Sequence, residues 1–232
     1  MKTEFALVFA CCSALLLGSV QAHAAKATIP GIPGVGTVTL DVVSIKEQRF
    51  HTTVRQQFDY SCGSAALATL LTYHYHNPVT EKTVFTEMWR SGDQEKIRRE
   101  GFSLLDIKNY LNAHGYAADG YAAPLAKLAE VGIPAIALIR DKGYNHFVVV
   151  KGVSTDKVLV GDPSLGGKTI PRQDFEKMLV NRILFVITSH QEVAVFDNPS
   201  DWNVRQKAPL GLARNPGILT DLTLYLPSPS SF

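Results

Sequence analysis

Cys62 is the residue of this sequence with the clearest potential for covalent chemistry. The other two cysteines, Cys11 and Cys12, lie in an apolar run near the first residue. Cys62 is followed by Gly63 and by small and apolar residues at helical spacing, which predicts a helix from Cys62 to about residue 75, with Ser61 as its N-cap. A helix start favours a thiolate through its dipole and free N–H groups. The predicted chemistry is nucleophilic acyl transfer.

Such a thiolate needs a base, and His146 is the best candidate. It begins the apolar sequence His-Phe-Val-Val-Val directly after a turn-like segment, residues 142–145. Asp162 follows the next predicted strand, within Gly-Asp-Pro-Ser. A hairpin would bring these two strands together, so the Asp162 carboxylate could hold His146 in the orientation that a base requires.

Gln56 is a candidate for stabilising the charge that develops on the substrate. Its side-chain amide could lie beside the backbone N–H of Cys62, and two such donors form an oxyanion hole. Gly63 would leave room for a substrate backbone. The alternative is a purely structural role, in which Cys62 is a buried, inert cysteine and the other residues are unrelated core and turn residues, since free cysteine buries readily. The joint pattern of the four residues favours the catalytic interpretation.

These residues, with their neighbours, resemble the C39 peptidases, a papain-like family best known as the leader-cleaving domain of bacteriocin export transporters. The similar segments are Gln56-x5-Cys62-Gly63-Ser64-Ala65, His146-Phe-Val-Val-Val and Gly161-Asp162-Pro163, within roughly residues 50–188. The resemblance implies a cysteine peptidase with catalytic Cys62, His146 and Asp162, and Gln56 in the oxyanion hole. It implies a polypeptide substrate and no cofactor. Ser61 stands where the family often has an acidic residue, and the sequence holds no transporter domain, so cleavage at a double-glycine leader does not follow.

The beginning of the chain predicts export. Lys2 precedes an apolar run from Phe5 to Val20, with small residues at Ala22 and Ala24, and this pattern is typical of a secretory signal peptide over residues 1–24. We therefore expect a soluble periplasmic protein without an integral membrane segment after cleavage. A signal peptide before a stand-alone domain is similar to the periplasmic C39 peptidases of functional-amyloid secretion systems. That similarity implies amyloid subunits or other secretion-system components as partners.

The elements that must position these residues predict an α+β fold. Helices are expected at 62–75, 81–89, 104–114 and 173–179, and strands at 135–139, 146–153, 157–160 and 182–188. Helices followed by strands predict a papain-like arrangement, in which an N-terminal helical part packs against an antiparallel sheet. We expect an extended N-terminal segment over 25–45, with a strand at 37–43. The peptidase domain is expected over 46–190 and a C-terminal extension over 191–232, where residues 222–226 could add a strand or dock a partner.

Charge and composition exclude some other functions. The net charge is only +2, and no clustered basic face is evident, so we expect no nucleic-acid partner. His74 and His76 lack neighbouring ligands at the right spacing, so we expect no metal site. Two alternatives keep the same residues: acyl transfer to an amine or hydrolysis of a non-peptide amide, and a binding module that escorts an unfolded client to a secretion pore.

Overall fold

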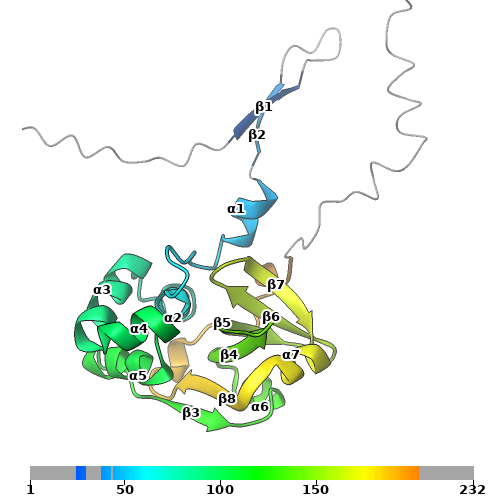
Figure 1. The fold of residues 1–232 in the computed structure, drawn as a ribbon. Coiled ribbons are helices and arrows are strands. Elements are labelled where there is room, and N and C mark those ends of the chain that lie inside the picture. Colours follow the sequence, from blue (N-terminus) through cyan, green and yellow to red (C-terminus); the bar gives the residue numbers. More distant parts are fainter. Residues whose placement is uncertain (1–24, 30–37, 43, 204–232) are drawn as a thin grey trace, which may run out of the picture. The chain divides into compact units, whose positions relative to one another are not determined.

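The computed structural model of the 232-residue chain describes residues 25–29, 38–42 and 44–203 (Figure 1). The predicted signal peptide and residues 222–226 lie outside these ranges. Strands β1 (Ala25–Ile29) and β2 (Val38–Val42) pair antiparallel and belong to a unit that ends at Val43. The strand predicted at 37–43 is therefore confirmed. Strand β1 was not predicted, although residues 25–29 precede the breakers Pro30 and Gly31.

The second unit begins at Ser44 and carries the helices. They are α1 (Ile45–Arg49), α2 (Cys62–His74), α3 (Glu81–Ser91), α4 (Gln94–Glu100), α5 (Leu104–Ala113), α6 (Ala126–Val131) and α7 (Arg172–Met178). Local signals explain where several of them begin. The side chains of Thr80 and Asp93 cap α3 and α4, and Ser103 and Asp106 form a capping box at the start of α5.

Six strands of this unit form one antiparallel sheet. They are β3 (Ala118–Ala122), β4 (Ala135–Asp141), β5 (Tyr144–Val153), β6 (Lys157–Asp162), β7 (Gly166–Pro171) and β8 (Leu179–Ile187). The strand order is β3-β8-β4-β5-β6-β7. Two short 3₁₀ helices follow, at Gln191–Val193 and Pro199–Asn203. The central strands are those with the longest apolar runs.

The sheet is buried on both faces. On β5, Val149 packs in a cluster with α2, α3 and α5, whereas Val148 and Val150 pack in a second cluster with Leu128 of α6 and Phe175 of α7. Because successive strand residues point to opposite faces, a strand covered on both sides must be apolar at nearly every position. Figure 1 shows the helices gathered on the two sides of the sheet. The predicted α+β class is confirmed.

Helix α2 is the central helix of this arrangement. It is buried almost all round, from Cys62 to Leu71, which fits a helix that is apolar on every side. It contacts β4, β5 and β6 of the sheet. Among the described residues, none of the helices is long and apolar enough to cross a membrane.

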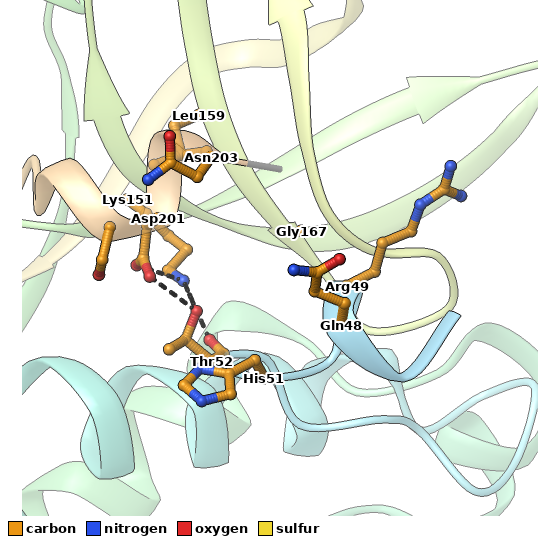
Figure 2. A pocket seen from close by; sticks show the side chains of 10 residues that line it. Gln48, Arg49, His51, Thr52, Lys151, Leu159, Gly167, Asp201 and Asn203 are labelled. Atoms are coloured by element: carbon orange, nitrogen blue, oxygen red, sulfur yellow. Dashed lines mark hydrogen bonds and ion pairs between the residues drawn. The ribbon is translucent and has the colours of Figure 1, made fainter. Parts of the chain in front are cut away.

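The segment after β8 folds back over the ends of α2 and β5. The backbone N–H of Val195 donates to the carbonyl of His74, and that of Asp197 donates to the carbonyl of Lys151. The buried Lys151 ammonium lies 2.6 Å from a carboxylate oxygen of Asp201 and also donates to the Thr52 hydroxyl. These groups border a cavity of about 240 Å³ between α1, the sheet and the last 3₁₀ helix (Figure 2). We call residues 194–203 the C-terminal strap.

Candidate active site

Three elements bring the predicted residues together. Cys62 is the first residue of α2, His146 lies near the start of β5, and Asp162 is the last residue of β6. Strands β5 and β6 pair antiparallel, as the hairpin argument requires, with Val149 opposite Gly161. His146 Nε2 lies 2.7 Å from Asp162 Oδ1. The other ring nitrogen, Nδ1, is therefore the one available to Cys62, which also interacts with His146.

The Asp162 carboxylate is almost fully buried, with 2% of the residue surface exposed. Oδ1 accepts hydrogen bonds from the backbone N–H of Ser164 at 2.9 Å, from its hydroxyl at 2.7 Å and from the N–H of Leu165 at 3.2 Å. Oδ2 accepts from the Lys168 ammonium at 2.7 Å. Burial alone would raise the pKa of Asp162, but the hydrogen bonds and positive charges of His146 and Lys168 hold that pKa well below its usual range.

His146 is held in its protonated form. Burial lowers the pKa of the imidazole, but the hydrogen bonds and negative charges of Asp162 and Cys62 outweigh it and raise the pKa to about 9. At neutral pH the imidazole therefore carries a proton on each nitrogen, one toward Asp162 and one available to the sulfur of Cys62. This is the proton arrangement that an imidazolium paired with a thiolate requires.

The start of α2 differs from the expectation in two details. Ser61 occupies the N-cap position, but its hydroxyl donates to the carbonyl of Phe58 and accepts from the N–H of Phe58 instead of capping the helix. The expectation for Gly63 is also wrong, because a Cβ at Gly63 would lie 2.9 Å from Cβ of Phe102. The missing side chain serves close packing of α2 against Phe102, and it does not open space for substrate.

Gln56 lies in the same region, but its amide is engaged elsewhere. Its backbone N–H donates to the carbonyl of Pro163, the neighbour of Asp162, at 3.0 Å. Its side-chain Nε2 donates to the carbonyl of Phe58 at 2.9 Å, and its Oε1 is buried without a hydrogen-bond partner in the part of the chain that the structure describes. The side chain must release Phe58 before it can serve as an oxyanion donor, so its role stays a prediction.

An open groove of about 800 Å³ extends from Cys62. One wall comes from the segment between α4 and α5, including Phe102, and from Leu104 at the start of α5. The other comes from β4, the β4–β5 turn and the start of β5, including Arg140 and the highly exposed Tyr144. An open groove beside a nucleophile suits an extended polypeptide segment better than a small enclosed ligand.

Lys168 and Ser164 are residues of the site that the sequence interpretation missed. Ser164 is the polar residue of the Gly-Asp-Pro-Ser turn, and its position two residues after Asp162 is a detectable signal for a side chain that bonds its neighbour. Lys168 lies on β7, a strand that was not predicted. No group of three or more potential metal ligands occurs among the described residues.

A cysteine at the start of a central helix, facing a histidine and an aspartate on an antiparallel sheet, is the arrangement of a papain-like cysteine peptidase. The family model described as Peptidase C39 family matches residues 51–191. The chain belongs to this family and is a cysteine peptidase.

The comparisons with individual proteins agree with this assignment. The chain is 42% identical to the "Probable functional amyloid protease FapD" of Pseudomonas aeruginosa, over 75% of this chain and 77% of that protein. It is also 42% identical to the protein of the same name from Pseudomonas fluorescens, over 69% of this chain and 71% of that protein. The crystal structure of the peptidase domain of Streptococcus ComA shares the fold, with a TM-score of 0.50 and 18% identity, and covers 59% of this chain and 98% of that domain.

Proposed function

We propose that this chain is an exported, periplasmic endopeptidase that cleaves a secreted or secretion-bound polypeptide through Cys62, His146 and Asp162. The observation that carries the proposal is the 2.7 Å contact between His146 Nε2 and the buried Asp162 carboxylate, with Cys62 on the other side of the ring. Cys62 then acts as the nucleophile, His146 as the proton carrier and Asp162 as the anion that orients the imidazole.

The acylation half of the reaction starts from the thiolate and the imidazolium. The Cys62 sulfur attacks the scissile carbonyl carbon, and the oxyanion is stabilised by the Cys62 N–H and by the Gln56 amide after it leaves Phe58. His146 Nδ1 then gives its proton to the leaving nitrogen as the C–N bond breaks. The products of this half are a thioester on Cys62, a free amine end and a neutral His146.

The deacylation half restores the site. Water attacks the thioester carbon while Nδ1 of neutral His146 accepts its proton. The C–S bond breaks, the new carboxyl end leaves, and the thiolate and imidazolium are regenerated. Throughout both halves, Asp162 accepts a hydrogen bond from Nε2–H and so keeps Nδ1 pointing at the sulfur.

The substrate we propose is a subunit of a functional amyloid, or another component of its secretion system. Two relatives that are 42% identical carry the name of a functional amyloid protease, and the open groove beside Cys62 suits an extended chain. The apolar run and small residues of the first 24 positions support export to the periplasm.

The test compares wild-type protein with Cys62→Ala and His146→Ala, incubated with the amyloid subunits produced by the same cell. We expect defined fragments from the wild type and none from either variant. His114→Ala is the matched control, because His114 also contacts an acidic residue, Glu87, at 3.1 Å but lies outside the site. It should cleave normally.

Export of the amyloid in cells separates this function from the alternatives. If Cys62→Ala still supports full export, the chain acts by binding its client, and the proposal fails. A new amide in place of a hydrolysed fragment would show acyl transfer to an amine.

A further inference from the structure

Lys168 is the partner of Asp162 that the reaction described above does not use. Its ammonium lies 2.7 Å from Oδ2, whereas His146 and the turn residues Ser164 and Leu165 all bond Oδ1. The carboxylate is therefore held from both sides. Lys168 is itself largely buried, with 20% of its side chain exposed, so its charge is screened less by water than that of a surface lysine.

The sheet register places this lysine. Asp162 of β6 is opposite Gly166 of β7, and Val160 is opposite Lys168. Asp162 and Lys168 are thus diagonal neighbours on one face of an antiparallel pair, a separation that a long side chain can span. Gly166 has a positive φ of 81°, which lets the chain turn tightly between the two strands.

The contact between Lys168 and Asp162 matters in the part of the reaction in which His146 is neutral. Asp162 is buried, so a nearby cation strongly favours its charged form. His146 supplies that cation only while it is protonated, and it loses its proton when the leaving amine departs. In the thioester intermediate the sulfur of Cys62 carries no charge either. Lys168 is then the remaining cation in contact with the carboxylate among the described residues.

We propose that Lys168 is a positioning residue that keeps Asp162 ionised and aligned on His146 Nε2 while His146 is neutral. The inference rests on the proposed roles of Cys62, His146 and Asp162. By offsetting the negative charge of Asp162, Lys168 also keeps His146 from retaining a proton that it must release to act as the base in deacylation.

The charged groups around this contact come from four elements. His146 on β5 interacts with Asp162 on β6 and with Cys62 on α2, and Asp162 interacts with His146 and with Lys168 on β7. Removal of Lys168 therefore leaves the negative charge of Asp162 less neutralised, so that Asp162 attracts the proton of His146 more strongly. The proton affinity of His146 rises, and deacylation at neutral pH slows.

The experiment uses p-nitrophenyl acetate as a small acyl donor, because the burst of nitrophenolate reports acylation of Cys62 and the steady state reports deacylation. The variants are Lys168→Met, Lys168→Gln, which keeps a donor without charge, and Lys168→Arg, which keeps both. Lys157→Met is the matched control, since Lys157 is an exposed, ion-paired lysine at the other end of β6.

We expect both neutral variants to keep the burst rate within about twofold and to lose about tenfold in deacylation at neutral pH. The pH midpoint of deacylation should rise by about one unit, because the variants lack the positive charge that opposes protonation of His146 through Asp162. Lys168→Arg and Lys157→Met should keep the wild-type midpoint. A merely structural role would lower the rate at every pH without moving the midpoint.

The inference is overturned if Lys168→Gln folds and deacylates with the wild-type midpoint. Two neutral variants are made in case Lys168→Met does not fold. Lys168→Gln keeps a hydrogen-bond donor for Asp162 and still lacks the charge. Cys62→Ala separates this failure from a failure of the proposed function. If Cys62→Ala retains the burst, the proposed nucleophile is wrong; if it loses the burst and Lys168→Gln behaves as wild type, only the role of Lys168 is wrong.

Discussion

The raised pKa of His146 predicts how the stability of the folded protein depends on pH. The pKa is about 9 in the folded protein against an ordinary value of 6.5. A shift of this size corresponds to about 3 kcal/mol of stabilisation of the imidazolium by its surroundings. Because the folded-state pKa lies above the unfolded value, this stabilisation is fully present below pH 6.5 and is lost as the pH rises through about 9.

The assay is urea denaturation from about pH 6 to about pH 10, with wild type and His146→Gln side by side. Glutamine can still donate a hydrogen bond to Asp162 but cannot carry a charge, so it removes the titration while keeping the donor. The difference in unfolding free energy between the two proteins should shrink by about 3 kcal/mol across this range. Groups that do not interact with His146 contribute equally to both proteins and cancel in the comparison.

The same pH range should affect the chemistry of Cys62. Iodoacetate is an anion, so an imidazolium beside the sulfur attracts it, and alkylation should decline above about pH 9 as His146 loses its proton. Iodoacetamide is neutral and should show no such decline. Parallel stability curves for wild type and His146→Gln, with both reagents behaving alike, would refute the assignment of a charged His146 at neutral pH.

Three further predictions concern stability, each measured by urea denaturation. Lys151→Met leaves the Asp201 carboxylate buried without its cation and should cost about 3–5 kcal/mol, whereas no loss would mean that the strap is not held by this pair. Gly63→Ala forces a methyl group to within 2.9 Å of Phe102 Cβ and should cost about 1–3 kcal/mol, although alanine is the better helix former; a gain in stability would show that Phe102 moves freely. Ser103→Ala removes the cap of α5 and should cost about 1 kcal/mol, and an unchanged midpoint would contradict the capping box.

The buried helices and strands could be predicted from the sequence because their positions follow from its runs of apolar residues. The helix expected from Cys62 to about residue 75 is α2, which runs from Cys62 to His74. The strand expected at 146–153 is observed as Tyr144–Val153. Apolar runs bounded by turn residues leave few alternatives when both faces of a strand are covered.

The edge strands were missed for a physical reason. Strand β3 contains Asp119 and Gly120, and β7 begins with Gly166 and Gly167 and ends with Pro171. Such residues have low intrinsic preference for strands. They become strands because β8 and β6 each offer a row of free backbone N–H and C=O groups to whatever segment lies alongside. These free backbone groups are available only after the inner sheet has formed, so the local sequence of an edge strand contains little signal that predicts it.

The candidate site likewise has residues that the sequence could predict and residues that it could not. The pairing of His146 with Asp162 followed from hairpin geometry, which sequence spacing specifies well. Lys168 could not be found, because its contact depends on the register of β7. The orientations of Gln56 and Ser61 depend on the carbonyl of Phe58, which competes for both side chains. Competition of this kind is decided by loop conformation rather than by residue type.

The C-terminal strap contributes contacts that can form only after the rest of the domain has been synthesised. Thr52 lies shortly before Gln56 in the chain, and it is bonded to Lys151 and to Asp201, which is far downstream. A chain made or exported from its N-terminus acquires Cys62, His146 and Asp162 before Asp201 arrives. During that interval the ammonium of Lys151 lacks the carboxylate of Asp201, and the loop that leads to Gln56 lacks its last anchor. The contacts of Asp201 with Thr52 and Lys151 are therefore among the last that this domain can form as the chain is made.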